Sequence, residues 1–180
     1  MRKILIVICL LAMLLLAGCA EKQAATEKGD LVFGSFVTTD MAGNPVTEEI
    51  FAGHSLTMVN IWATFCSPCI EEMPELAQLD TAFGEAFQVI GIVMDVTDRN
   101  GIIQPDKKAE AASVIATTGA TYLHLLPSAS LNKAYLNQVQ AVPETIFVDA
   151  AGRQVGQRYI GKKSQQEWSK IIAALLESTD

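Results

Sequence analysis

Two cysteines separated by two residues are the part of this sequence most suited to chemistry. Cys66 and Cys69 enclose Ser67 and Pro68, at a point where a strand pattern changes to a helix pattern. The spacing puts both sulfurs within reach of one disulfide across a first helical turn. A helix N-terminus has free N–H groups and roughly half a positive charge, which stabilise a thiolate. The pattern predicts thiol-disulfide exchange, in which Cys66 attacks a target disulfide and Cys69 resolves the mixed disulfide.

A buried strand and a helix are predicted on either side of this pair. Residues 55–63 contain a continuous apolar run, which suits a central strand covered on both faces. Residues 68–84 have apolar side chains at helical spacing, and residues 87–93 form a second apolar strand. Strand, helix and strand in this order imply a right-handed parallel crossover. The cysteines are therefore expected at the carboxyl end of a central strand.

The remaining elements complete a three-layer α/β domain. A mostly parallel central sheet with an antiparallel edge hairpin, covered by helices on both faces, accounts for their order. Ser164 and Glu167 form a capping box at the start of the last helix. We expect an N-terminal hairpin that starts with residues 31–39, helices at 106–118 and 128–136, strands at 122–126, 145–148 and 154–160, and a terminal helix after residue 164.

The N-terminus has the pattern of a secretory signal peptide. Arg2 and Lys3 precede 14 apolar residues, a run shorter than the roughly 20 residues that span a bilayer. The run ends in Leu16-Ala17-Gly18-Cys19, which resembles the bacterial lipobox and implies cleavage after Gly18 and a lipid on the sulfur of Cys19. Two or more acyl chains anchor a protein stably. An ordinary signal peptide or an uncleaved anchor is the alternative.

Cleavage would divide the chain into a signal peptide at residues 1–18, a polar tether at 19–30 and one domain at 31–178. The whole chain has 180 residues, 50% of them hydrophobic, and a net charge of −7. Losing the two N-terminal basic residues leaves 11 basic and 20 acidic side chains, and a net charge of −9. The apolar content of the chain excludes a wholly disordered protein. Its net negative charge argues against nucleic acid as the main partner.

Two structural roles compete with exchange chemistry for the cysteine pair. A static disulfide is weakly motivated, because closing a very short loop stabilises a fold little. A structural zinc ion needs four ligands. Cys9 leaves with the signal peptide, Cys19 carries lipid, and neither His54 nor His124 stands at ligand spacing. We therefore expect no metal, and no cofactor beyond the redox-active pair. His124, in a predicted strand, is expected to be a hydrogen-bonded core histidine.

Two motifs carry a family resemblance. Residues 59–69 read Val-Asn-Ile-Trp-Ala-Thr-Phe-Cys-Ser-Pro-Cys, with Glu-Glu-Met-Pro at 71–74, and residues 142–152 read Val-Pro-Glu-Thr-Ile-Phe-Val-Asp-Ala-Ala-Gly. The first resembles the active-site segment of thioredoxin-superfamily proteins, above all the membrane-tethered TlpA/ResA-like thiol-disulfide oxidoreductases. The second is similar to their cis-proline loop and following hairpin. The resemblance covers about residues 31–178 and implies a thioredoxin-like α/β/α fold with a mixed sheet, an N-terminal β-hairpin and an insertion at 96–118.

The resemblance implies roles for single residues. Pro143 would be cis, with its loop packed against the disulfide, and the backbone of Val142 would pair with an extended substrate. Glu72 falls where these reductases carry an acid that accepts the proton of Cys69. A first-turn acid favoured by the helix dipole is its alternative role, and the main one for Glu71. Substrate contacts are expected from Trp62, Ser67, Pro68 and Val142.

Four further positions depart from the pattern or invite another interpretation. Glu144 follows the proline where Thr is common, so its carboxylate would raise the pKa of a nearby thiol or point into solvent. Asn60 stands where cytosolic thioredoxins have a buried Asp. Asp95 and Asp98 lack the spacing of a calcium-binding loop and are expected in a solvated turn.

The leading hypothesis is an extracytoplasmic, lipid-anchored, monomeric thiol-disulfide reductase. By resemblance, electrons come from an integral-membrane thiol donor and pass to a protein disulfide. The expected targets are apocytochrome c during cytochrome c biogenesis, or an extracytoplasmic methionine sulfoxide reductase or peroxidase.

Three other functions compete with reduction of protein disulfides. A dithiol oxidase differs only in reduction potential. A peroxiredoxin is disfavoured because Thr64 is one residue too close to Cys66 and no arginine lies between Lys28 and Arg99. A copper-delivery or ligand-binding lipoprotein is disfavoured because copper carriers of this fold use a three-residue spacer.

Overall fold

A computed structural model describes residues 29–179. The expected signal peptide, the expected lipidation site Cys19 and most of the expected tether lie outside these residues. Among the described residues, no helix is long and apolar enough to cross a membrane. The strands are β1 (Val37–Thr39), β2 (Pro45–Thr47), β3 (Leu56–Trp62), β4 (Phe87–Val93), β5 (Leu123–Leu125), β6 (Glu144–Val148) and β7 (Gln154–Ile160). The helices are α2 (Ser67–Ala82), α3 (Pro105–Thr118), α4 (Ala129–Ala134) and α5 (Gln165–Thr179), with short 3-10 turns at Glu48–Phe51, Gly84–Ala86 and Leu136–Gln138.

The central sheet has the strand order β5-β4-β3-β6-β7, and β3 lies at its centre. All seven residues of β3 are buried. The strand runs parallel to β4, with Met58 opposite Val89, and antiparallel to β6, with Val59 opposite Ile146. Side chains on both faces of β3 therefore contact the core, which explains its continuous apolar run. The predicted mixed sheet and its central strand are confirmed.

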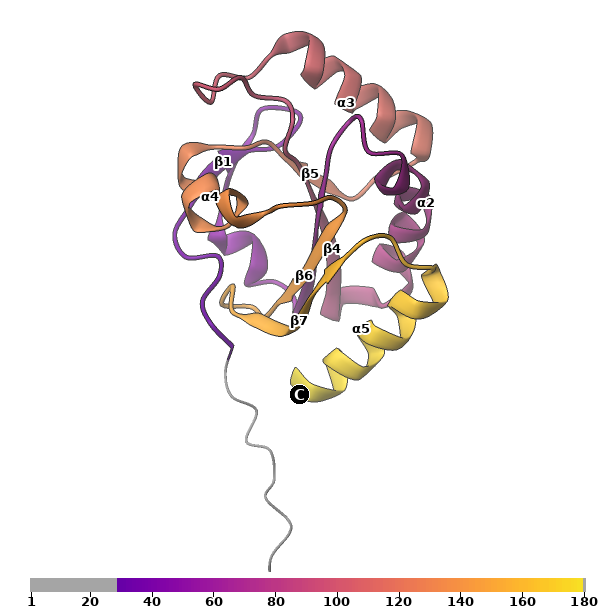
Figure 1. Ribbon diagram of the computed structural model, residues 1–180. Helices are drawn as coiled ribbons and strands as arrows, with labels where there is room; N and C mark the ends of the chain where they lie inside the picture. The colour runs from indigo at the N-terminus through magenta and orange to yellow at the C-terminus, as the bar shows by residue number, and fades with distance from the viewer. Residues whose placement is uncertain (1–28, 180) are drawn as a thin grey trace, which may run out of the picture.

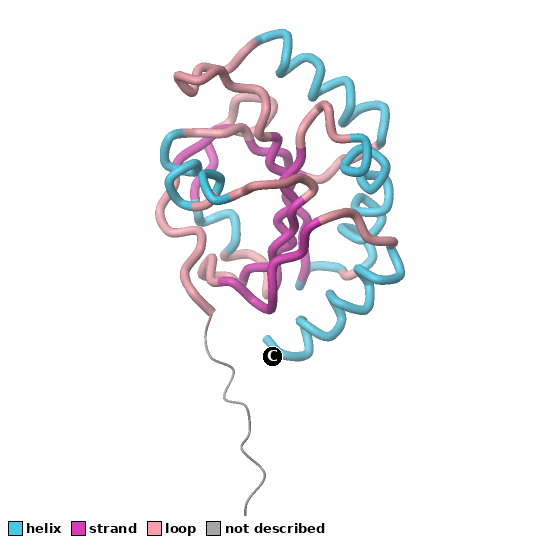
Figure 2. The backbone as a smooth tube through the Cα atoms, in the orientation of Figure 1, coloured by secondary structure: helices cyan, strands magenta, loops and turns pink. Residues whose placement is uncertain are grey.

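Helices cover both faces of this sheet (Figures 1 and 2). Helices α2, α3 and α5 lie on one face, and α4 lies on the other with the β1–β2 hairpin. The first core contains both cysteines together with Met73, Leu76 and Trp168. The second contains Phe33, Phe36, Phe51, Leu131 and Tyr135. Alternation along β3 divides its side chains between these two cores, as a period of two requires.

The N-terminal hairpin differs from its predicted form. Only Val37–Thr39 forms a strand within residues 31–39, and it pairs with β2 in a separate two-stranded sheet. The segment before β1 is held in two ways. The N–H groups of Val32 and Phe33 both donate to Gly152 O at 3.1 Å, and the rings of Phe33 and Phe36 pack on Phe51 with centroids 5.5 and 6.1 Å away.

The last helix begins with the predicted capping box. Ser164 Oγ donates to Glu167 Oε2 at 2.6 Å, and the backbone N–H of Glu167 donates back to Ser164 Oγ at 3.4 Å. A capping box satisfies N–H groups that have no partner inside a helix. The box thus fixes where α5 begins, next to the loop that reaches α2.

His124 is a hydrogen-bonded core histidine, as predicted. It lies opposite Gly91 of β4, where an added Cβ would be 2.3 Å from His124 Nδ1. Trp62 Nε1 donates to Nδ1 at 3.3 Å. Because the indole N–H can only donate, Nδ1 accepts, and Nε2 carries the hydrogen that faces Ala120 O at 3.1 Å. Burial lowers the pKa of His124 to about 4, against the opposing effect of the Ala120 carbonyl.

We predict that His124 makes the fold sensitive to acid. Its folded-state pKa of about 4 lies below its ordinary value of 6.5, so the unfolded chain binds a proton first as the pH falls. The stabilisation is present above about pH 6.5 and is lost toward pH 4, by about 3 kcal/mol. Urea unfolding at pH 7 and pH 4.5 measures this loss. His124→Asn, which keeps an acceptor for Trp62 but does not titrate, should show a smaller loss; equal losses in both proteins would contradict the prediction.

Candidate active site

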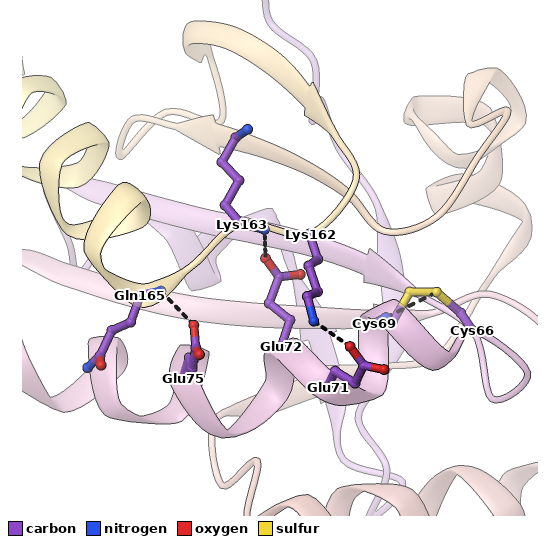
Figure 3. Close-up of polar contacts among 8 residues, drawn as sticks. All are labelled: Cys66, Cys69, Glu71, Glu72, Glu75, Lys162, Lys163 and Gln165. Atoms are coloured by element: carbon purple, nitrogen blue, oxygen red, sulfur yellow. Dashed lines mark hydrogen bonds and ion pairs between the residues drawn. A yellow bond between two sulfur atoms is a disulfide. The ribbon is translucent and has the colours of Figure 1, made fainter.

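The two cysteines form a disulfide at the start of α2 (Figure 3). Their Cα atoms are 5.3 Å apart, Cys66 is the N-cap of the helix, and Cys69 lies in its first turn. The backbone N–H of Cys69 donates to Cys66 Sγ at 3.3 Å. Cys66 is 5% exposed and Cys69 is 1% exposed, so Cys69 is the more buried sulfur, as expected. The N–H groups of the helix therefore stabilise a thiolate on Cys66.

A tight turn connects β3 to Cys66. The N–H of Cys66 donates to Ala63 O at 3.1 Å. Inside the turn, Thr64 is buried, whereas the side chain of Phe65 is 74% exposed. Asp95, which follows β4, accepts two hydrogen bonds from Thr64, at 3.0 Å from its N–H and 2.6 Å from its hydroxyl. The sequence predicted only a solvated turn for Asp95; its place beside Thr64 follows from the parallel pairing of β3 and β4.

The cis-proline loop lies at the same end of β3. The Val142–Pro143 peptide bond is cis, which confirms that expectation. Glu144 begins β6 and pairs with Ile61, so the preceding residues reach the end of β3. Val142 is half-buried and packs against the core that contains the cysteines. The chain thus brings together two motifs that are 73 residues apart, counted from Cys69 to Val142.

Glu72 is a buried carboxyl that lies one turn further along α2 than Cys69 (Figure 3). Its side chain is 1% exposed. Oε1 accepts from Trp168 Nε1 at 2.5 Å and from the N–H of Lys163 at 3.1 Å. Oε2 is buried and has no hydrogen-bond partner among residues 29–179. Burial raises the pKa of Glu72, and the two hydrogen bonds oppose that rise. Glu72 therefore holds a proton at a higher pH than an ordinary glutamate.

Two neighbouring acids connect α2 to the loop before α5. The exposed Glu71 forms an ion pair with Lys162. Glu75 accepts from the N–H of Gln165 at 2.5 Å. Together with Glu72, these contacts hold the loop along one side of α2, as Figure 3 shows. Glu71 thus has a surface role, in line with its expected lesser part in the chemistry.

One expected substrate contact, that of the Trp62 side chain, is wrong. Trp62 is fully buried, and its indole N–H is occupied by His124. The residue lies in the central strand, so its ring supports the site from within and cannot meet a substrate. Ser67 and Pro68 are exposed beside Cys66 and are accessible to one. Their contact with substrate stays a prediction, as does that of Val142.

Glu144 does not point into solvent. It is fully buried, and its Oε1 accepts from the hydroxyl of Tyr135 at 2.7 Å. Arg158 Nη1 lies 3.8 Å from Oε2. Burial, and then the hydrogen bond to Glu144, raise the pKa of the Tyr135 hydroxyl. This carboxylate therefore ties the start of β6 to the α4 side of the sheet, a role that the sequence did not reveal.

No metal centre accompanies these residues in the part of the chain that the structure describes. No group of three or more His, Cys, Asp or Glu side chains within it is arranged to hold a metal ion. A hollow of about 680 Å³ lies beside Gly29, Asp149 and the end of α5, and neither cysteine lines it.

Comparisons with known proteins agree with this geometry. The sequence model of the Redoxin family matches residues 27–175. The thiol:disulfide interchange protein HelX of Rhodobacter capsulatus is 31% identical over 136 residues, which cover 75% of this chain and 69% of the relative. The thiol:disulfide interchange protein DsbE of Vibrio cholerae is 28% identical over 98% of this chain and 96% of its own length. The thiol-disulfide oxidoreductase ResA of Bacillus cereus is 33% identical over 43% of this chain and 47% of its own.

Solved structures show the same fold. A putative DsbE from Chlorobium tepidum superposes with a TM-score of 0.66, over 84% of this chain and 99% of that one, at 20% identity. A thioredoxin-family thiol:disulfide interchange protein of the same organism gives a TM-score of 0.64. Fold and site thus define a thioredoxin-like thiol-disulfide oxidoreductase. The chain belongs to the Redoxin family, and within it to the TlpA/ResA-like oxidoreductases.

We predict that Trp168 controls the protonation of Glu72. Trp168→Phe keeps an aromatic ring in the core but removes the N–H that favours the carboxylate, so the pKa of Glu72 should rise further. NMR titration of the Glu72 side-chain carboxyl carbon measures this change. Tyr159→Phe is the matched control, because Tyr159 packs on Trp168 with ring centroids 5.4 Å apart and makes no hydrogen bond to Glu72. An unchanged Glu72 pKa in Trp168→Phe would refute the prediction.

Proposed function

We propose that this protein is an extracytoplasmic, lipid-anchored reductase of protein disulfides. The observation that carries the proposal is the Cys66–Cys69 pair at the start of α2, with the buried Glu72 in the next turn of the same helix. Other carboxyl groups lie further along α2, where Glu71 pairs with Lys162 and Glu75 accepts from the N–H of Gln165, and after β4, where Asp95 holds Thr64. Negative charge near the pair destabilises a thiolate. The dithiol then gives up its electrons more readily, so the pair acts as a reductant.

The reaction consists of two exchange steps. The thiolate of Cys66 attacks one sulfur of the target disulfide, forming a mixed disulfide while the other target sulfur leaves as a thiolate. Cys69 then gives up its proton and attacks the sulfur of Cys66. The second target thiol departs, and the Cys66–Cys69 disulfide remains. Two electrons thereby pass to the target, and Glu72 is the group assigned to accept the proton from Cys69. A thiol donor reverses both steps and reduces the pair again.

A target segment would dock across the exposed residues beside Cys66. Phe65 offers an apolar side chain that is 74% exposed, and Ser67 and Pro68 are also exposed. We assign backbone pairing with the extended target to Val142, next to Pro143. Such pairing places the target sulfur near Cys66 without requiring a specific target sequence. The pair itself is proposed to be the only redox group, with no separate cofactor.

The cellular setting of the proposal rests on the N-terminal sequence and on the named relatives. The lipobox at 16–19 supports a lipid on Cys19 and a location outside the cytoplasm. HelX, DsbE and ResA carry names for thiol-disulfide exchange. We propose an integral-membrane thiol protein as electron donor. Apocytochrome c is the first target, a methionine sulfoxide reductase or peroxidase the second, and the domain acts as a monomer.

A dithiol oxidase is the competing function, and one observation favours it. The N–H of Cys69 donates to the Cys66 sulfur at a helix N-terminus, and a stabilised thiolate makes a disulfide a stronger oxidant. The helix and the acidic groups therefore act in opposite directions on the same pair. The reduction potential measures which effect is larger.

We predict a reduction potential in the reducing range for the Cys66–Cys69 pair. Because acidic groups disfavour the thiolate, equilibration with glutathione should give a value below about −150 mV, since strong oxidants lie near about −120 mV. Glu72→Gln removes one ionisable carboxyl and should make the potential less negative at alkaline pH. The control is Glu85→Gln, on the 3-10 turn after α2. A wild-type value above about −150 mV would assign the protein to disulfide formation instead.

We also predict that Cys69→Ala traps the targets at the membrane. Without Cys69, the mixed disulfide on Cys66 has no resolving thiol, so full-length protein isolated from cells should carry covalently bound partners, identified by mass spectrometry. The bound species should sediment with membranes. The double variant Cys19→Ala/Cys69→Ala lacks the lipid, so its adducts with soluble targets should leave the membrane fraction, whereas an adduct with the integral-membrane donor should stay in it. Absence of any adduct that a thiol reductant releases would count against exchange, and membrane retention of the adducts with soluble targets would count against lipidation.

A further inference from the structure

The side chain of Asp95 takes the place of the next backbone hydrogen bond between β3 and β4. The ladder between β3 and β4 continues to Met94, whose N–H donates to Trp62 O at 2.9 Å. Beyond this point the carboxylate of Asp95 takes over. Oδ1 accepts the N–H of Thr64 at 3.0 Å, and Oδ2 accepts its hydroxyl at 2.6 Å. Both oxygens of one carboxylate thus hold a single residue, with charge-assisted hydrogen bonds.

Thr64 is the second residue of the turn that presents Cys66. The turn is closed by the N–H of Cys66, which donates to Ala63 O. Thr64 is 5% exposed and fixed by Asp95, whereas Phe65 after it is 74% exposed. The direction in which Phe65 and Cys66 leave the sheet is therefore set at Thr64.

We propose that Asp95 is the positioning residue of the attacking thiol, acting through Thr64. The inference rests on the proposed exchange reaction and extends it to a residue outside both cysteine and proline motifs. Asp95 holds the turn so that Cys66 Sγ stays at the helix N-terminus, within reach of the Cys69 N–H, and faces the target disulfide. Displacing a reacting atom by about 1 Å can slow a reaction by roughly 100-fold.

The reduced protein depends on this contact more than the oxidised protein. In the oxidised form the covalent bond to Cys69 fixes the position of Cys66. Reduction removes that bond, and the hydrogen bonds of the turn then hold Cys66 by themselves. Asp95 therefore matters most in the state that attacks a target.

The experiment measures the reaction of the reduced full-length protein with oxidised glutathione over a range of pH. Each series gives the thiol pKa of Cys66 and a pH-independent rate constant for its thiolate. Asp95→Ala removes both acceptors, and Thr64→Val removes the hydroxyl but leaves the backbone N–H. Asp95→Asn keeps both contacts, since its amide oxygen accepts from the N–H and its amide nitrogen donates to the hydroxyl oxygen.

The matched control is Asp98→Asn. Asp98 lies three residues further along the same connection and accepts from the N–H groups of Asn100 and Ile102, at 2.9 and 2.8 Å. It carries the same charge as Asp95 and its hydrogen bonds stay within its own turn. Any effect of charge alone, or of disturbing this connection, should therefore appear in Asp98→Asn as well.

We expect Asp95→Ala and Thr64→Val to lower the pH-independent rate constant by about tenfold, the scale of one lost charge-assisted hydrogen bond. Asp95→Asn should stay within about twofold of wild type, and Asp98→Asn should match wild type. The double variant Thr64→Val/Asp95→Ala should be no slower than Asp95→Ala, because the two residues act as one unit. The reverse reaction of each oxidised variant with reduced glutathione should change less than the forward one.

Wild-type rate constants in both Asp95→Ala and Thr64→Val would overturn the inference, as would an equal loss in Asp98→Asn. If Asp95→Ala does not fold, Thr64→Val and Asp95→Asn still decide the question, since a wild-type rate constant in Thr64→Val refutes it. Oxidised glutathione reports the attack by Cys66 whatever the physiological target is. A reduction potential in the oxidising range would therefore refute the proposed reductase function. It would not affect the test of Asp95, which compares rate constants between variants.

Discussion

The burial of β3 on both faces is the constraint on which the rest of this structure depends. A strand with no exposed face can meet solvent only at its ends, and the carboxyl end of β3 is where the turn to α2 begins. The helix therefore starts at the rim of the sheet, and its free N–H groups surround Cys66. The same burial draws β6 against β3 and carries Pro143 to that rim. Each part of the site follows from one strand being fixed on both sides.

The carboxyl groups at this rim differ in what they contact, and therefore in what they do. Glu72 is buried, and burial raises its pKa against the hydrogen bonds from Trp168 and Lys163, as suits the proton carrier that we propose. Glu144 is also buried with one oxygen lacking a hydrogen bond among the described residues, but that oxygen faces Arg158 and the other accepts from Tyr135, so Glu144 fixes a strand. Asp95 uses both oxygens to hold a turn. Their roles follow from their hydrogen-bond donors, and not from residue type or from proximity to sulfur.

The sequence predicted the parts of this arrangement that local patterns encode. The apolar run of β3, the cysteine spacing, the capping box at Ser164 and the Val-Pro pair each lie within a short segment, and each was confirmed in position. Prediction failed where a contact joins distant segments. Trp62 was expected to contact a substrate, but its indole N–H is taken by His124, which lies 62 residues away in β5. Asp95 and Glu144 were interpreted without their donors, because no local pattern indicates which residue a side chain will meet across a sheet.

The hydrogen bonds of Glu72 have a consequence for how the chain is made. The donors Lys163 and Trp168 lie 91 and 96 residues after it, whereas the two cysteines lie only three residues apart. During synthesis, the dithiol is therefore complete long before the segment that holds the acid exists. A nascent or truncated chain that ends before α5 has a reactive pair, but its Glu72 lacks both donors. The buried, hydrogen-bonded setting of Glu72 is therefore complete only after α5 has been made, although the two cysteines lie in the N-terminal half of the chain.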